Sequence, residues 1–240
     1  MATDFDKRRD FTVPSQFDNR EQAGRALAAS LALHRDEPLL LVLGMARGGV
    51  PVAFPVALEL GAELDVLVVR KVRAPGQPEL AIGAVGPGDV CVLNDDIIAR
   101  LEIMPDELAQ AIREARAELA HREQCYRCHR PDCSVRGRPV IIIDDGLATG
   151  ASLEAAIAWV RLQKARKVIA AVPVAAADSL QRLQPKVDEF VAIETPRDFQ
   201  AVSRWYRQFD QTSDERVIQL LDQARFRLGC DIHVDPGGLR

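Results

Sequence analysis

The chain has 240 residues and a formal net charge of −4 at pH 7, and 48% of its residues are hydrophobic and 28% charged. This composition supports a core the size of one large domain or two small ones, and the negative charge disfavours broad nucleic-acid or anionic-membrane binding. No run reaches the roughly 18 consecutive apolar residues of a membrane-spanning helix. The charged start, MATDFDKRRDF, lacks an apolar signal core, so we expect a cytoplasmic protein.

Apolar runs that suit buried strands alternate with stretches of helical periodicity. An Asp18-x-x-Glu21 capping box predicts the start of a first helix, which carries Ala23, Leu27 and Leu31 on one face. In chain order, the expected strands are residues 39–44, 65–69, 140–143, 167–175 and 186–194, and the expected later helices are residues 51–60, 105–119, 153–160 and 217–224. Continuous apolar strands of this kind form a mostly parallel sheet with helices on both faces. We therefore predict a single α/β domain whose ligand lies at the carboxyl ends of the strands.

A stretch rich in glycine and proline, residues 73–89, follows the second predicted strand. This composition predicts turns, with part of the stretch paired as a hairpin and part of it mobile. The acidic pair Asp95 and Asp96 comes next, and we interpret it as helix capping without a chemical role.

Three of the five cysteines cluster in one short segment, where Cys125, Cys128 and Cys133 lie near His121 and His129. The C-x-x-C spacing suits tetrahedral zinc, and CYRCH matches the pattern for covalent haem, although haem attachment normally follows export. The third interpretation is ordinary reduced cysteines at a helix end. We favour this last one and predict no stoichiometric zinc.

Two aspartates, Asp144 and Asp145, follow the most apolar strand and precede a loop of small residues that opens a helix. Free backbone N–H groups at a helix start, together with the helix dipole, form an anion site that small residues let a phosphate approach closely. Carboxylates accept hydrogen bonds from vicinal hydroxyls, so the pair suits a sugar diol. The pattern therefore predicts a dianion on residues 147–152 with a diol site one short step away, and a sugar 5-phosphate has both features.

The stretch VIIIDDGLATGAS, residues 140–152, resembles the signature of the type I phosphoribosyltransferases, which bind phosphoribosyl pyrophosphate (PRPP). The stretch LGMARGGVPVA, residues 43–53, resembles the pyrophosphate loop of that family, and residues 73–88 resemble its flexible loop. Together these motifs cover roughly residues 20–180 in the correct order. The resemblance implies that Asp144 and Asp145 hold the ribose hydroxyls. It implies that the 5-phosphate lies on Gly146, Leu147, Ala148, Thr149, Gly150, Ala151 and Ser152. It also implies that a cis-like turn at Ala46, Arg47, Gly48 and Gly49 binds pyrophosphate, and that Arg70 and Lys71 neutralise the charge of the pyrophosphate.

The resemblance also implies a core at about residues 20–180 and a small C-terminal hood at about residues 185–215, within a domain of residues 1–228. We expect residues 229–240 to be a flexible tail. The hood carries an aromatic cluster, Phe199, Trp205, Tyr206 and Phe209, which has two open interpretations. It stacks on a flat base, or it covers the core.

By the resemblance, the expected reaction is Mg²⁺-dependent transfer of ribose 5-phosphate from PRPP to a nucleobase with release of pyrophosphate. The Mg²⁺ is expected to be held mainly by substrate and water, with no protein metal ligand. The alternative is a non-catalytic PRPP or nucleotide sensor; a P-loop ATPase is disfavoured because the chain has no G-x-x-x-x-G-K-[ST] motif. The expected partners are PRPP and a nucleobase, without nucleic acid or membrane, and a homodimer is an assembly to test.

Overall fold

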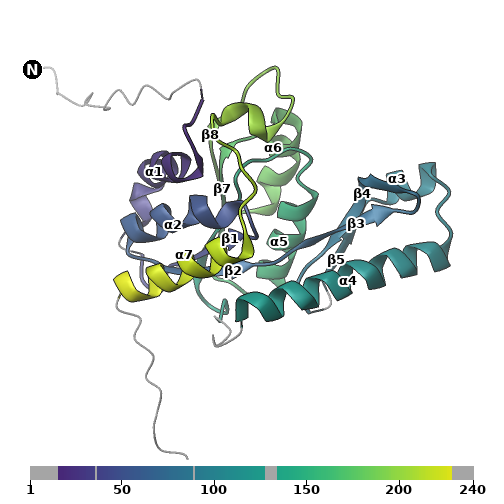
Figure 1. Ribbon diagram of the computed structural model, residues 1–240, viewed down its shortest axis with the longest axis horizontal. Coiled ribbons are helices and arrows are strands. Elements are labelled where there is room, and N and C mark those ends of the chain that lie inside the picture. The colour runs from purple at the N-terminus through teal and green to yellow at the C-terminus, as the bar shows by residue number, and fades with distance from the viewer. Residues whose placement is uncertain (1–15, 36, 89, 128–133, 229–240) are drawn as a thin grey trace, which may run out of the picture.

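A five-stranded parallel sheet forms the centre of the computed structural model, which describes residues 16–35, 37–88, 90–127 and 134–228 (Figure 1). Its spatial order is β2-β1-β6-β7-β8. These strands are β1 (Leu41–Met45), β2 (Glu63–Leu67), β6 (Pro139–Ile143), β7 (Lys167–Val174) and β8 (Glu189–Glu194). All four neighbouring pairs are parallel, which confirms the predicted fold class.

Helices cover both faces of this sheet, because successive residues of each buried strand point to opposite sides. Val42 and Ile141 face the core under α1, α2 and α7, whereas Leu43 and Ile142 face the core under α5 and α6. The helices are α1 (Arg20–Ser30), α2 (Gly49–Leu60), α5 (Ala151–Leu162), α6 (Ala177–Leu183) and α7 (Asp214–Arg227), with the short turns η1 (Ala32–His34), η2 (Gln184–Lys186) and η3 (Val202–Trp205). None of the described helices is both long enough and apolar enough to span a membrane.

A separate antiparallel sheet of three strands projects from the central sheet, with a long helix running along it (Figure 1). We call this projection the arm. It contains β3 (Arg70–Ala74), β4 (Gln77–Val85), β5 (Cys91–Leu93), α3 (Asp95–Arg100) and α4 (Pro105–Arg127). Pairing of β3 with β4 confirms the hairpin predicted for part of residues 73–89. Mobility of this hairpin in solution stays a prediction.

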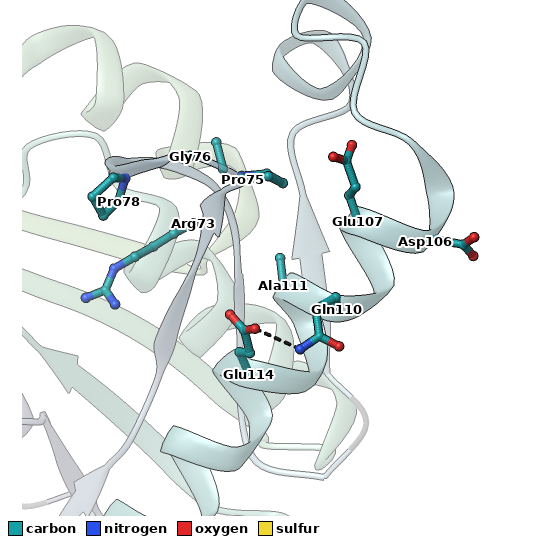
Figure 2. A pocket seen from close by; sticks show the side chains of 10 residues that line it. Arg73, Pro75, Gly76, Pro78, Asp106, Glu107, Gln110, Ala111 and Glu114 are labelled. Carbon is teal, nitrogen blue, oxygen red and sulfur yellow. Dashed lines mark hydrogen bonds between the residues drawn. The ribbon is translucent and has the colours of Figure 1, made fainter.

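The tip of the arm encloses a cavity of about 610 Å³ between the β3–β4 turn and α4. Figure 2 shows Arg73 and Pro78 on one side and the acidic face of α4 on the other, where Gln110 donates to Glu114. Neither the acid pair 144–145 nor the loop 146–152 lines this cavity. The cavity is therefore distinct from the predicted ligand site.

The predicted helix start at Asp18 is displaced by one residue. Asn19 is the N-cap of α1, and its side-chain oxygen accepts a hydrogen bond from the amide of Gln22 at 2.9 Å. Gln22 completes the exchange by accepting from the amide of Asp18 at 2.5 Å. The correction has a simple reason, since Asp and Asn both have the chemistry of an N-cap and local sequence does not choose between neighbours.

The second acidic pair, Asp95 and Asp96, also lies next to an asparagine that caps a helix. Asp95 and Asp96 lie in the first turn of α3, where negative charge is favourable, while Asn94 provides the capping side chain.

Of the cysteine cluster, Cys125 is an exposed residue of α4, whereas Cys128 and Cys133 fall outside the described residues. The absence of zinc stays a prediction, and residues 229–240 also lie outside the described range.

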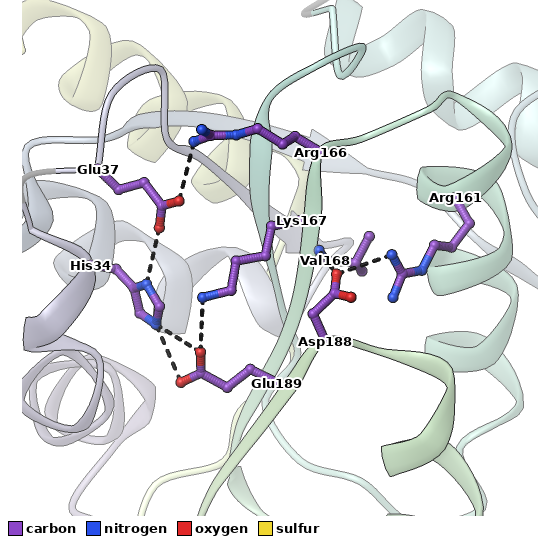
Figure 3. A network of polar contacts seen from close by, with 8 residues as sticks. All are labelled: His34, Glu37, Arg161, Arg166, Lys167, Val168, Asp188 and Glu189. Atoms are coloured by element: carbon purple, nitrogen blue, oxygen red, sulfur yellow. Dashed lines mark hydrogen bonds and ion pairs between the residues drawn. The ribbon is translucent and has the colours of Figure 1, made fainter.

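A polar network closes the amino-terminal edge of the sheet (Figure 3). The buried ring of His34 contacts Glu37 at 3.1 Å and Glu189 at 3.2 Å. Arg166 and Lys167 pair with the same two glutamates, each at 3.2 Å. The network lies at the starts of β7 and β8, at the opposite end of the sheet from the acid pair. We therefore interpret it as a set of contacts that stabilise the fold and do not take part in the ligand site.

Candidate active site

The predicted site residues meet at the carboxyl ends of β1 and β6. From β1 the chain runs to β2 on one side, whereas β6 leads to β7 on the other side. This reversal of strand order opens the crevice where open α/β sheets bind their ligands. The loop 46–49 leaves the end of β1, and Asp144 and Asp145 leave the end of β6.

Two glycines let the loop 46–49 press against the acid pair. A Cβ atom built on Gly48 would lie 2.0 Å from Oδ2 of Asp145, and one built on Gly49 would lie 2.4 Å from the carbonyl oxygen of Ile143. The peptide bond between Ala46 and Arg47 is cis, in agreement with the expected cis-like turn. Side chains at positions 48 and 49 would therefore separate the two loops that the sequence predicted to act together.

The acid pair is held by internal hydrogen bonds. Oδ1 of Asp144 accepts from the amide of Asp145 at 2.9 Å. Oδ2 of Asp145 accepts a hydrogen bond from Nε of Arg20 at 2.8 Å, and Nη2 of Arg20 lies 2.8 Å from the same oxygen in an ion pair. Burial raises the pKa of both carboxyl groups, and the neighbouring charge of Asp145 raises the pKa of Asp144 further. The charge and the hydrogen bonds of Arg20 oppose this rise in the pKa of Asp145.

Residues 206–209 of the C-terminal segment cover the acid pair, and Phe17 near the N-terminus packs against them. The hydroxyl of Tyr206 donates to the carbonyl oxygen of Asp145 at 2.6 Å, and its ring packs against Phe17 and Phe209. The amide of Phe17 donates to the carbonyl oxygen of Trp205 at 2.8 Å. The rings of Tyr206 and Phe209 therefore pack against each other over the acid pair, which favours the covering role for this half of the aromatic cluster.

The phosphate loop is shaped by contacts from α6. Ser179 donates from Oγ to the carbonyl oxygen of Ala148 at 2.5 Å, and Nη2 of Arg182 donates to the carbonyl oxygen of Thr149 at 2.7 Å. In a trans peptide the carbonyl and the following N–H point in opposite directions. Both carbonyls are thus turned toward α6, and the N–H groups of Thr149 and Gly150 point away from α6.

Leu147 does not contribute its amide to this anion site. Its N–H donates to the carbonyl oxygen of Val174 at 2.8 Å, and its side chain is buried in the core. The bridge between Leu147 and Ala175 therefore already uses the backbone of Leu147, and a contact of Leu147 with phosphate stays a prediction. Gly150 has a left-handed backbone with φ of 78°, which lets the loop turn into α5.

The two basic residues of β3 have different surroundings, as expected for successive residues of a strand. Lys71 lines a cavity of about 580 Å³ together with Thr149, Ala151 and Arg182. Arg70 instead donates to the carboxylate of Glu118 on α4, at 3.0 Å from Nε. The structure thus brings Lys71, and not Arg70, to the cavity beside the phosphate loop, and the expectation that both side chains neutralise pyrophosphate stays a prediction.

A family model for the phosphoribosyl transferase domain matches residues 15–206. The chain belongs to this family. All five strands of the central sheet, the acid pair and the phosphate loop lie within the matched residues.

The relatives agree with this assignment. Two provisionally named phosphoribosyl transferases of Mycobacterium tuberculosis, Rv0571c of strain H37Rv and MT0597 of strain CDC 1551, are 45% identical over 208 residues, which is 87% of this chain. The match covers 47% of each of those proteins, so the chain spans about half of their length. The crystal structure of TT1426 from Thermus thermophilus is 43% identical with a TM-score of 0.74, covering 87% of this chain and 98% of that one.

Within this phosphoribosyl transferase domain, sequence reasoning missed Arg20, Ser179 and Arg182. Each touches the site from an element other than the motif it supports, so no spacing within a motif could identify it. The only local signal is that Arg20 opens α1, the first helix of the domain.

Proposed function

We propose that the domain transfers ribose 5-phosphate from PRPP to a nucleobase and releases pyrophosphate. One observation carries the proposal. The acid pair at the end of β6 is continuous with the phosphate loop, and it also lies in contact with the loop 46–49 that leaves β1. A phosphate site, a diol site and a second anion site in this order match the three parts of PRPP.

In the proposed reaction, a ring nitrogen of the base forms a bond to C1 of ribose as the bond from C1 to the pyrophosphate oxygen breaks. Pyrophosphate leaves with the electron pair of that bond, and the proton of the attacking nitrogen passes to solvent. The transition state resembles an oxocarbenium ion, so the chain contributes mainly positioning and charge stabilisation. Asp144 and Asp145 orient the ribose, and the cations assigned to the leaving group are Lys71 of β3 and Arg47 of the loop 46–49.

Bound Mg²⁺ would supply positive charge to the pyrophosphate leaving group. Among the residues that the structure describes, no group of three His, Cys, Asp or Glu is arranged to hold a metal. The proposal therefore has substrate oxygens and water as the main ligands of the cation, which is common for Mg²⁺.

The test is release of pyrophosphate from PRPP and Mg²⁺ with a panel of purines and pyrimidines. Wild-type protein should release pyrophosphate with at least one base, and Asp144→Asn and Asp145→Asn should lower turnover about 100-fold or more through lost positioning and charge stabilisation. Wild-type turnover in both variants would rule out the catalytic role of the acid pair.

The rival function is a sensor that binds PRPP or a nucleotide without chemistry. Tight PRPP binding by calorimetry, combined with no pyrophosphate release for any base, would favour the sensor. The position of Lys71 beside the phosphate loop disfavours only a sensor that reads ribose phosphate alone, because such a sensor needs no further cation.

A further inference from the structure

Arg20 is the one described side chain that forms an ion pair with the acid pair, and its geometry is specific. Its Nε and Nη2 atoms both lie 2.8 Å from Oδ2 of Asp145. The side chains of Arg20 and Asp145 are only 12% and 16% exposed, so solvent screens this pair much less than a surface ion pair. A charge-assisted hydrogen bond at this distance, with a second nitrogen in an ion pair to the same oxygen, restrains the carboxylate of Asp145.

The guanidinium itself is fixed from the opposite direction. Its Nη1 atom donates to the carbonyl oxygen of Asp210 at 2.7 Å, and its carbon lies 3.9 Å from the centre of the Phe209 ring. The carboxylate, the backbone carbonyl and the ring therefore contact different parts of the Arg20 head group. Lysine cannot reproduce this set, because its ammonium has neither the planar fork nor the flat face.

The oxygens of the acid pair divide into two kinds once these contacts are counted. Oδ1 of Asp144 accepts from the amide of Asp145, and Oδ2 of Asp145 accepts from Arg20. Oδ2 of Asp144 and Oδ1 of Asp145 are the other two oxygens of the pair. A vicinal diol supplies two hydroxyl donors, one for each of these two oxygens.

We propose that Arg20 is a positioning residue of the ribose site: its guanidinium occupies Oδ2 of Asp145, so that Oδ1 is aimed at a hydroxyl of the ribose. The inference rests on the proposed function, because it concerns the diol of the same ligand. Arg20 lies in α1 and contacts both Asp145 and the backbone of Asp210. The segment 206–210, which covers the acid pair, and the side chain of Asp145 are therefore held by the same guanidinium.

The experiment compares two ligands that differ only in the diol. Ribose 5-phosphate and 2,3-dideoxyribose 5-phosphate are titrated by calorimetry into wild-type protein, Arg20→Gln and Arg20→Lys. Wild-type protein should bind the diol-bearing ligand about tenfold tighter or more, the scale of about 1.4 kcal/mol of hydrogen bonding to charged groups. Arg20→Gln should keep its affinity for the dideoxy ligand within about twofold and lose most of the discrimination, and Arg20→Lys should recover part of it.

The matched control is Arg25→Gln, which removes an exposed arginine from the same helix whose partner is Glu21. It should discriminate as wild-type protein does. Wild-type discrimination in folded Arg20→Gln overturns the role of Arg20; if that variant does not fold, undiminished discrimination in Arg20→Lys overturns it equally. Wild-type protein that does not distinguish the two ligands removes the diol site itself, and with it the proposed function.

Discussion

Gly48 lies so close to Asp145 that a Cβ atom at position 48 would be 2.0 Å from Oδ2 of Asp145 and 3.2 Å from Nε of Arg20. The backbone of Gly48 is right-handed helical, with φ of −64°, so alanine is permitted there by conformation alone. What excludes a side chain at this position is contact with the site, and not backbone strain.

Gly48→Ala should therefore affect the ligand site more than the fold. The new methyl group meets the end of a side chain, which can move, and displaces the Asp145 carboxylate from Arg20. We expect a loss of discrimination between ribose 5-phosphate and its dideoxy analogue, measured by calorimetry, with a small change in thermal stability.

Gly49→Ala is the informative comparison. There the methyl group would meet the carbonyl oxygen of Ile143 at 2.4 Å and Cα of Asp144 at 3.0 Å, which are backbone atoms at the end of a central strand. We expect a loss of about 1–3 kcal/mol in the free energy of unfolding, as for other overpacked sites. Equal stability of the two variants in urea titrations would contradict this distinction.

Ser179→Ala should weaken phosphate binding without any direct contact to phosphate. The variant removes the donor that turns the carbonyl of Ala148 toward α6. A hydrogen bond of this kind contributes about 0.5–1.5 kcal/mol, which corresponds to roughly a two- to tenfold loss of affinity for inorganic phosphate in calorimetry. Ser203→Ala, at an exposed serine, is the control, and an equal effect of both substitutions would show that Ser179 has no special role.

The acid pair should make stability depend on pH in an unusual direction. Burial and the charge of Asp145 raise the pKa of Asp144 well above its usual value of 3.8. A carboxyl group whose pKa is higher in the folded state stabilises the fold below the pKa of the unfolded chain, and this contribution is lost as pH rises through the folded pKa. At neutral pH the ionised pair therefore costs stability.

Asp144→Asn should accordingly raise the melting temperature at about pH 7, and the gain should shrink as the pH is lowered toward about 4. Asp145→Asn should gain less, because it also loses the ion pair with Arg20. Ligand affinity has the opposite pH dependence, since the diol needs ionised acceptors, and ribose 5-phosphate binding by wild-type protein should weaken as pH falls through the raised pKa values. Melting curves of Asp144→Asn that run parallel to wild type at every pH would contradict the assignment.

Lys71 and Arg70 should differ sharply although they are neighbours. Lys71→Ala should weaken PRPP binding about tenfold and leave ribose 5-phosphate binding nearly unchanged, because the proposed function assigns the charge of Lys71 to the pyrophosphate leaving group. Arg70→Ala should change PRPP affinity by less than about twofold, because its guanidinium already pairs with Glu118. A larger loss in Arg70→Ala would mean that the arm rearranges when ligand binds.

Closure of the arm is a separate prediction that distinguishes enzyme from sensor. Hydrogen exchange across residues 73–88 should slow when PRPP and Mg²⁺ are added and not with ribose 5-phosphate alone, since an enzyme must exclude water from PRPP. Lys71→Ala should abolish this protection. Equal protection by both ligands, or by neither, would favour the sensor.

The sequence by itself determined the features of this protein that depend on local order. All five central strands were predicted to within a few residues, because buried parallel strands are continuous apolar runs. The position of Asp144 and Asp145 at a strand end, and of the small-residue loop at a helix start, follows from the same local pattern. The one-residue displacement from Asp18 to Asn19 shows the limit of local rules, since both residues have the chemistry of a cap.

Only the tertiary structure decided which distant residues complete the site. Arg20 meets Asp145, and Ser179 meets the carbonyl of Ala148, through the packing of α1 and α6 against strand ends far away in the chain. Such contacts depend on strand order and helix placement, which leave no periodic signal. The same reason explains Arg70: whether it faces the ligand or Glu118 depends on which face of β3 turns toward α5, and that face is chosen by packing of the arm.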